Sequence, residues 1–202
     1  MIEVEKKFLL TPIQQQSLLL DARKLGERSF KDSYFDTSDY RLTTNDLWFR
    51  KRNETYELKA PLSLKGDTST TVSKFQEITA VEEIRRKLSL EETGDFEFAL
   101  SDAGIKPFMT CFTHRKSYEK QGLRVDIDSA TYFHSDFTHT VAEIELLVDD
   151  ESEINEAENR IIKFARSFNL VTNRFILGKV AAYLKQEIPG HYETLVKAGI
   201  LE

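Results

Sequence analysis

The amino terminus carries an alternation of side chains that few folds can accommodate. Residues 1–8 read Met-Ile-Glu-Val-Glu-Lys-Lys-Phe, the period-two pattern of a β-strand. One face is apolar apart from Lys6, and the other holds Glu3, Glu5 and Lys7. Same-face neighbours on a strand lie about 6–7 Å apart. Two carboxylates at that spacing repel each other unless a cation lies near them. The strand therefore needs either water or positive charge on its acidic face.

The same spacing returns along the chain. Charged residues stand two apart in four later stretches, namely Arg50 and Arg52, Glu57 and Lys59, Arg124, Asp126 and Asp128, and Glu143 and Glu145. Arg115 lies in a further predicted strand. The simplest alternative is a set of solvated surface strands. Five such strands instead favour a closed or strongly curved sheet with charges inside and an apolar outer face covered by helices.

Cap and stop residues predict where the covering helices begin and end. Thr11 and Pro12 are suited to the start of a helix, which Gly26 would end. Further helices are predicted at 81–88, 96–103, 153–168 and 174–185, and from Pro189. Residues 61–71, rich in Ser, Thr, Lys and Gly, are predicted to form a long mobile loop.

Length and composition limit the class of protein. A chain of 202 residues with 40% hydrophobic residues favours one globular domain, residues 1–202. A net charge of −6 argues against a general nucleic-acid surface. The single cysteine, Cys111, excludes an intrachain disulfide. We find no signal-peptide pattern and no apolar run of membrane-spanning length, so we expect a cytoplasmic protein without a membrane partner.

The charges predicted to lie inside are of both signs. The acidic candidates are Glu3, Glu5, Glu57, Asp126, Asp128, Glu143 and Glu145, and the basic ones are Lys7, Arg50, Arg52, Lys59, Arg115, Arg124 and Lys179. Burying so many charges for stability alone is costly, because desolvation opposes ion-pair attraction. Clustered carboxylates suit Mg²⁺, and Arg and Lys suit phosphate oxygens. Together they predict a site for a metal-chelated polyphosphate, bound by side chains because the chain has no Gly-rich phosphate loop.

A known family shares these motifs. Glu3-Val4-Glu5-Lys6-Lys7 matches the Glu-x-Glu-x-Lys signature of the CYTH superfamily, the triphosphate tunnel metalloenzymes. The further motifs that resemble the family, in its order, are Tyr34-Phe35-Asp36-Thr37, Trp48-Phe49-Arg50-Lys51-Arg52, Glu57-Leu58-Lys59, Arg124-Val125-Asp126-Ile127-Asp128, Glu143-Ile144-Glu145 and Gly178-Lys179. Within the superfamily the chain most resembles the animal thiamine triphosphatases. The resemblance implies an α+β fold, an eight-stranded antiparallel β-barrel with helices packed on the outside.

The resemblance also implies roles for individual residues. Mg²⁺ is expected to be the cofactor, with Glu3, Glu5, Asp126 and Glu145 as its ligands. The triphosphate is expected to bind Lys7, Arg50, Arg52, Lys59, Arg115 and Lys179, with Glu143 touching substrate or orienting a basic neighbour. Tyr34 with Lys59 resembles the proposed catalytic base pair. Trp48 can attract a cationic thiazolium ring through a cation–π interaction, although a lone Trp also serves as core filler.

The leading expectation for function is Mg²⁺-dependent hydrolysis of thiamine triphosphate to the diphosphate and phosphate. Three alternatives use the same tunnel: hydrolysis of inorganic tripolyphosphate, cyclisation of ATP as in class IV adenylate cyclases, and binding of triphosphate without catalysis. Trp48 favours an organic cationic substrate over bare tripolyphosphate. We expect a monomer whose partner is a small triphosphate.

Overall fold

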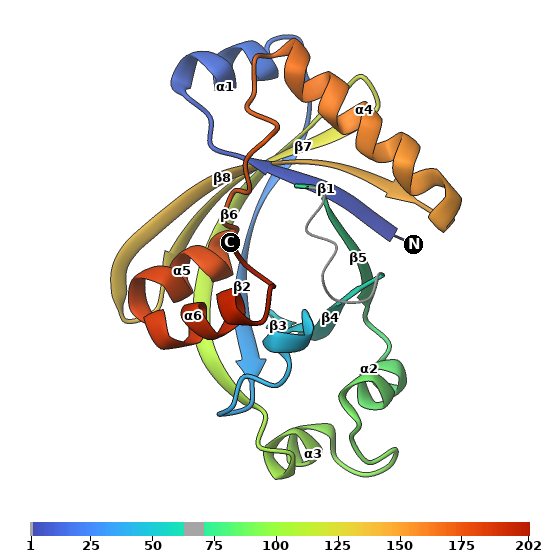
Figure 1. Ribbon diagram of the computed structural model, residues 1–202, viewed down its shortest axis with the longest axis vertical. Helices are drawn as coiled ribbons and strands as arrows, with labels where there is room; N and C mark the ends of the chain where they lie inside the picture. Colours follow the sequence, from blue (N-terminus) through green and yellow to red (C-terminus); the bar gives the residue numbers. More distant parts are fainter. Residues whose placement is uncertain (1, 63–70) are drawn as a thin grey trace.

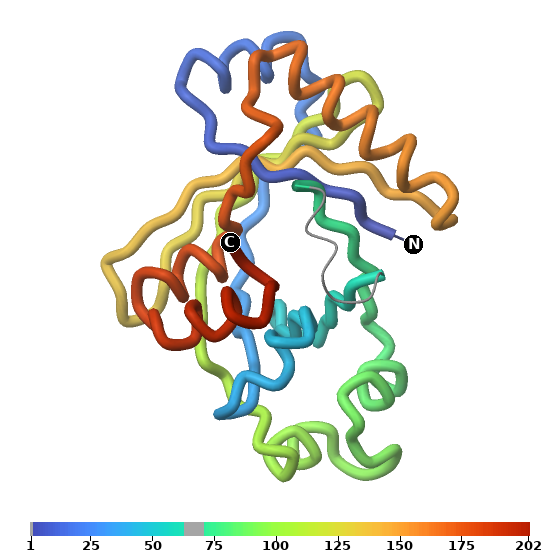
Figure 2. Tube along the Cα trace, in the orientation of Figure 1, coloured from blue at the N-terminus to red at the C-terminus, as the bar shows by residue number. Residues whose placement is uncertain are grey.

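The computed structural model describes residues 2–62 and 71–202. Its strands close into an antiparallel barrel in the order β1-β5-β4-β3-β2-β6-β7-β8 (Figures 1 and 2). The strand bounds are β1 (Ile2–Phe8), β2 (Arg23–Asp36), β3 (Trp48–Arg52), β4 (Thr55–Pro61), β5 (Ser73–Ile78), β6 (Lys106–Lys120), β7 (Leu123–Tyr132) and β8 (Ser135–Val148). The predicted eight-stranded antiparallel barrel with helices outside is therefore confirmed.

Helices cover the outer faces of the strands. Their bounds are α1 (Pro12–Leu19), α2 (Val81–Leu88), α3 (Phe96–Asp102), α4 (Ile154–Ser167), α5 (Lys179–Glu187) and α6 (Pro189–Lys197), with short 3₁₀ turns at Thr43–Asn45 and Glu151–Glu153. The apolar face of β1 packs with those of β7 and β8 beneath α4, where Val4 and Ile144 belong to one buried cluster with Ile161. A second cluster joins Leu58 of β4 to Ile84 of α2. Burial of these side chains explains why the charged positions face inward.

The last two helices cover one end of the barrel. Along β6, Met109 and Cys111 fall on the same alternating face as Arg115, so the inner face changes from charged to apolar toward this end. Both residues are buried in a cluster with Leu184 of α5 and Leu195 of α6. Figure 1 shows α5 and α6 side by side against the long strands. The charged part of the barrel interior is therefore bounded on this side by an apolar plug.

The first helix is shorter than its sequence pattern predicts. Thr11 caps α1 as expected, with its side chain accepting a hydrogen bond from the backbone of Gln14. The helix ends at Leu19, and the chain enters β2, which passes through Gly26 at a register shift against β6. Ile13 is 79% exposed, so the apolar face extending to residue 25 is not buried as a helix face. Pairing with the long strand β6 outweighs the local helical pattern in this segment.

Other boundaries differ by less. Helix α5 begins at Lys179, after Gly178, and not at residue 174. The predicted exception on the apolar face of β1, Lys6, is almost fully buried and donates hydrogen bonds to the carbonyl oxygens of Thr71 (3.1 Å) and Arg174 (3.3 Å). Most of the loop predicted at 61–71 lies outside the described residues.

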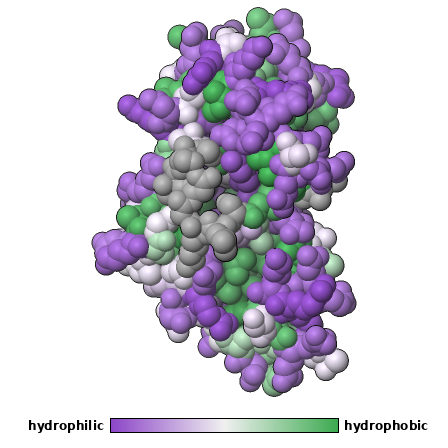
Figure 3. All heavy atoms as spheres, turned by 45° about the vertical axis from the view of Figure 1, so that its right-hand side comes forward, coloured by the Kyte–Doolittle hydropathy of each residue, from purple (hydrophilic) through white to green (hydrophobic). Residues whose placement is uncertain are grey.

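The outer surface fits this burial pattern. On the face drawn in Figure 3, hydrophilic side chains predominate and apolar ones form separate patches. In the described chain, no helix combines the length and the apolar character that a membrane span requires.

Candidate active site

A cavity of about 440 Å³ occupies the charged part of the barrel. Almost all the residues predicted for the site line it: Glu3, Glu5, Lys7, Tyr34, Trp48, Arg50, Arg52, Lys59, Arg115, Glu143, Glu145 and Lys179. Asp126 is the exception, because it is fully buried behind the basic side chains. The alternation read from the sequence thus places residues from six strands and the start of α5 around one space.

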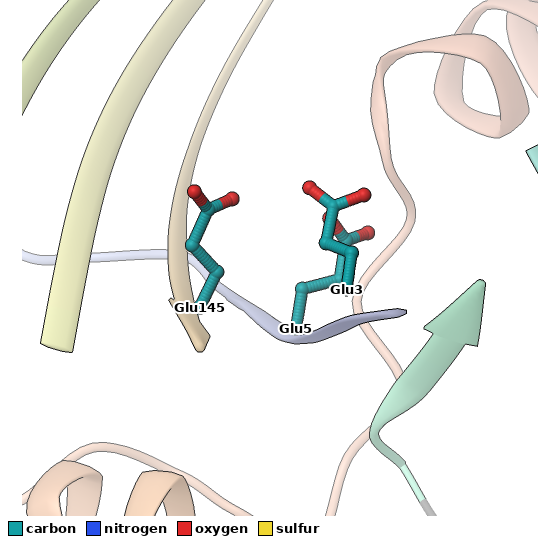
Figure 4. Close-up of side chains that lie close together, drawn as sticks. All are labelled: Glu3, Glu5 and Glu145. Atoms are coloured by element: carbon teal, nitrogen blue, oxygen red, sulfur yellow. The ribbon is translucent and has the colours of Figure 1, made fainter. Parts of the chain in front are cut away.

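Three carboxylates meet on the wall formed by β1 and β8. Glu3, Glu5 and Glu145 each have an oxygen within 4.8 Å of the others, and Figure 4 shows their carboxylates gathered together. Glu5 lies directly opposite Glu145 in the β1–β8 ladder. Oε2 of Glu145 is buried and has no hydrogen-bond partner within the described chain. Such an orphaned oxygen in an acidic cluster fits a hard divalent cation, which prefers oxygen ligands.

Asp126, the fourth predicted metal ligand, is engaged elsewhere. Its carboxylate accepts hydrogen bonds from Arg115 (2.7 Å) and Arg124 (3.1 Å). Asp126 lies opposite Glu143 on β8, and Arg124 lies opposite Glu145. The structure therefore brings three of the four predicted ligands into one cluster, with Asp126 one step behind them.

The pKa values of two carboxyl groups in the acidic cluster, Glu145 and Glu5, are shifted in opposite directions. Burial raises the pKa of Glu145 to about 8, with further increases from Glu3 and Asp126. Burial also acts to raise the pKa of Glu5, but Lys59 and Lys7 outweigh it and hold that pKa well below its usual range. One carboxyl group therefore retains a proton near neutral pH while its neighbour across the ladder is ionised. A cation bound here would displace that proton.

Two lysines neutralise the ionised carboxylates. Nζ of Lys59 contacts Glu3 and lies 3.5 Å from Glu5, and Nζ of Lys7 contacts Glu5. Burial acts to lower the pKa of Lys59, but the adjacent carboxylates Glu5 and Glu3 raise it well above its usual value. A Cβ at Gly178 would lie 2.9 Å from Cε of Lys7. The absence of a side chain at residue 178 therefore allows Lys7 to extend along the wall.

Arg115 sits at the centre of a second acidic group. Its guanidinium donates to Asp126, to both oxygens of Asp128 at 2.6 Å, and to Glu143 at 2.7 Å. Burial acts to lower the pKa of Arg115, but these carboxylates, with Glu143 foremost, raise it well above its usual value. A buried cation held by three carboxylates has a fixed orientation, which suits two-point recognition of the oxygens of an anion.

The opposite wall, from β2, β3 and β4, holds a third group. Arg52 donates to both oxygens of Asp32, at 2.8 and 3.0 Å, and Lys179 reaches the same carboxylate. Arg50 donates to Glu57 at 2.7 Å and to Glu77 at 2.9 Å. Each basic group is thus held by a carboxylate that a bound phosphate can replace or share.

The two predicted aromatic site residues lie near one end of the cavity. The hydroxyl of Tyr34 accepts a hydrogen bond from Arg50 at 3.2 Å. Trp48 donates its indole N–H to Asp46 at 2.7 Å and stands opposite Lys59 in the β3–β4 ladder. In the described part of the chain, no hydrogen bond joins Tyr34 and Lys59. The structure shows both residues in one cavity, with different partners.

On the inner face of β2, sequence reasoning identified Tyr34 but missed Arg28, Phe30 and Asp32. Phe30, Asp32 and Tyr34 are buried on this face, and Arg28, two residues before Phe30, is exposed. Phe30 is buried, with four cationic side chains within 6 Å of its ring: Arg28, Arg52, Arg115 and Lys179. The period-two spacing of Arg28, Asp32 and Tyr34 could have predicted this face. The apolar Phe30 interrupts the run of polar side chains, so the pattern was not recognised.

Comparisons with known proteins agree with this geometry. The model of the CYTH domain family matches residues 1–176. A protein named thiamine-triphosphatase from Homo sapiens is 28% identical over 212 residues, covering 98% of this chain and 90% of the relative. Its counterpart from Macaca fascicularis is 27% identical with the same coverage.

Solved structures show the same fold. The PH1819 protein of Pyrococcus horikoshii OT3 aligns with a TM-score of 0.64 and 19% identity, over 92% of this chain and 99% of that one. A protein from Hippeastrum, reported to have a dominant triphosphatase activity, aligns with a TM-score of 0.50 and 15% identity, over 91% of this chain and 94% of that one. At these identities the likeness concerns the fold.

Proposed function

The chain belongs to the CYTH domain family, and we propose that it hydrolyses thiamine triphosphate to thiamine diphosphate and phosphate with Mg²⁺. The observation that carries the proposal is the cavity itself, in which basic side chains on several walls face a carboxylate cluster with an orphaned oxygen. The two relatives named thiamine-triphosphatase, which cover nearly the whole chain, support the choice of substrate. In broader terms, we propose that the chain is a hydrolase of phosphoanhydride bonds.

Binding of the triphosphate is assigned to the basic residues of the cavity. These are Lys7, Arg50, Arg52, Lys59, Arg115 and Lys179. In the free protein each forms an ion pair with a carboxylate. A triphosphate oxygen replaces or shares that partner, and the cations are already held in the cavity when substrate arrives. Glu143 supports Arg115 at 2.7 Å and lies 3.8 Å from Lys7, which orients both toward the phosphates.

The metal is assigned to Glu3, Glu5 and Glu145, with Asp126 behind them orienting the basic neighbours. A divalent cation bound there supplies further neutralisation of charge on the phosphate oxygens. Deprotonated Glu145 is the form that can serve as a ligand, and a pKa of about 8 means that protons compete with the cation near neutral pH.

Hydrolysis also needs an oriented water. We assign this step to Tyr34 and Lys59, which line the same cavity. The raised pKa of Lys59 keeps it cationic at neutral pH while Glu3 and Glu5 are its partners. Lys59 therefore stabilises the negative charge that forms on the phosphoryl oxygens, and the hydroxyl of Tyr34, held by Arg50, positions the attacking water.

Trp48 is assigned to the organic part of the substrate. It lines the cavity where β3 begins, and its register partner is Lys59. A cationic ring beside an indole gains about 0.5–2 kcal/mol. Bare tripolyphosphate has no ring and cannot use this contact.

The proposed domain spans residues 1–202. Helices α5 and α6 lie beyond residue 176, where the family match ends, yet α5 supplies Lys179 to the cavity. We also propose a monomer, which molar-mass measurement in solution tests directly.

Phosphate release from thiamine triphosphate, tripolyphosphate and ATP, measured side by side with Mg²⁺, tests the proposal. We expect the highest kcat/KM for thiamine triphosphate. A higher value for tripolyphosphate would make this an inorganic triphosphatase, and formation of cyclic AMP would make it a cyclase. Tight binding of triphosphate without turnover would mean that the chain binds triphosphate and does not hydrolyse it.

A further inference from the structure

Arg28 differs from the other basic residues of the cavity in its partners. In the described part of the chain, each of the other cationic side chains that line the cavity forms an ion pair with a carboxylate, whereas Arg28 forms none. Its guanidinium carbon lies 5.5 Å from the centroid of the Phe30 ring. A guanidinium has five N–H donors and no acceptor, so Arg28 keeps its hydrogen-bonding capacity for water or an added anion.

The surroundings of Arg28 are strongly positive. It stands directly opposite Arg115 in the β2–β6 ladder, and like charges in that position destabilise a sheet. Burial, then Arg115, Arg124 and Arg52, lower the pKa of Arg28, against a smaller increase from Asp126. The same ring of Phe30 also faces Arg52 at 4.1 Å. Arg28 therefore belongs to the cationic group of the cavity but, unlike its neighbours, has no ion-pair partner in the described part of the chain.

Its position along β2 separates Arg28 from the aromatic end of the site. The inner-face residues run Arg28, Phe30, Asp32, Tyr34, and Tyr34 pairs with Arg50 while Asp32 pairs with Arg52. Six residues along a strand span about 20 Å. Arg28 thus lies beyond Arg50 and Arg52, level with Arg115, and its side chain is exposed.

We propose that Arg28 forms an additional phosphate subsite, which binds a phosphoryl group beyond the three of a bound triphosphate. The inference rests on the proposed function, since it takes the triphosphate to occupy the cations between Arg50 and Arg115. Two sources share this chemistry. One is the fourth phosphoryl group of a linear polyphosphate, and the other is the inorganic phosphate that hydrolysis releases. A bidentate Arg–phosphate contact suits either.

Isothermal titration of the full chain in excess chelator, where neither probe is expected to be hydrolysed, tests the subsite, with tetraphosphate and tripolyphosphate as probes. Arg28→Gln is the test variant, and Arg28→Lys should recover part of the loss. Arg23→Gln is the matched control, because Arg23 is an exposed arginine on the same strand, paired with Glu119. If the fourth phosphoryl group binds Arg28, Arg28→Gln weakens tetraphosphate binding about 10-fold more than tripolyphosphate binding.

A second measurement separates the two sources. If the released product binds there, the inhibition constant of inorganic phosphate rises about 10-fold in Arg28→Gln, and the tetraphosphate-to-tripolyphosphate ratio stays as in the wild type. The subsite would be overturned if Arg28→Gln kept the wild-type ratio of tetraphosphate to tripolyphosphate binding and the wild-type inhibition constant of inorganic phosphate. A wild-type chain that shows the Arg28-dependent ratio but does not hydrolyse thiamine triphosphate would overturn the proposed function and leave the subsite standing.

Discussion

Glu5 of β1 and Glu145 of β8 lie directly opposite each other in the barrel wall, so two carboxyl groups share one point of the inner face. Their pKa values move in opposite directions, with that of Glu5 held low by Lys59 and Lys7 and that of Glu145 raised to about 8. Ionising both would place like charges directly opposite each other, which destabilises a sheet. A protein keeps such a pair where a cation is to be bound, and this relationship is the basis of the first two predictions.

The first prediction is metal dependence. Hydrolysis should stop when divalent cations are chelated and return with Mg²⁺. Glu5→Gln removes an ionised ligand from the cluster, so the Mg²⁺ concentration for half-maximal rate should rise about 10-fold or more. Glu82→Gln, an exposed carboxylate on α2, is the control and should titrate like the wild type. Full turnover in excess chelator would exclude the assigned metal site.

The second prediction concerns pH in the absence of metal. The folded protein retains the Glu145 proton that the unfolded chain releases above about pH 4.5, so this residue makes the free energy of unfolding fall as pH rises toward about 8. Thermal denaturation should show the wild-type Tm falling more steeply than that of Glu145→Gln between about pH 5 and 8. Each 1 kcal/mol corresponds to about 2–4 °C in a chain of this size. Parallel curves for the two proteins would contradict the raised pKa.

A third prediction addresses substrate choice through Trp48. Replacing it by Ala should reduce kcat/KM for thiamine triphosphate by about 2- to 30-fold, the range of a cation–π contact. Tripolyphosphate hydrolysis should change little, since that substrate has no ring. Trp48→Phe keeps an aromatic face and serves as the control, with a smaller loss expected. Equal losses on both substrates would assign Trp48 a structural role.

Tyr34 and Lys59 give a fourth prediction. If they act on the same water and phosphoryl group, Tyr34→Phe and Lys59→Ala should each lower kcat strongly, and the double variant should cost little more than the worse single one. Tyr34→Phe also removes one of the three acceptors of Arg50, so KM should be measured beside kcat. Fully additive losses would mean separate roles, with Lys59 a phosphate ligand alone.

The fifth prediction uses Gly178. A Cβ there would lie 2.9 Å from Cε of Lys7, so Gly178→Ala should displace the end of that side chain and raise KM about 10-fold with little change in Tm. Gly190→Ala is the matched control, because a Cβ at Gly190 meets nothing within 4 Å. Unchanged KM in Gly178→Ala would show that Lys7 adapts without cost.

Much of the fold follows from local pattern. The period-two alternation of Glu3, Glu5 and Lys7 predicts which face of β1 is charged, because successive side chains on a strand point to opposite sides. The same rule predicts the inner faces of β3, β4, β7 and β8, and hence a charged interior. The family resemblance then gives the number of strands and their closure.

Which charges meet was decided by the tertiary structure. Alternation says which way Asp126 points but not its level along the barrel, and that level depends on the register between strands distant in sequence. Register placed Glu145 opposite Glu5 and Arg124, and left Asp126 with the two arginines. It likewise drew residues 23–26 into β2, where pairing with β6 outweighed the helical pattern. Periodicity is a local property of the chain, whereas register is set by burial of the whole outer face at once.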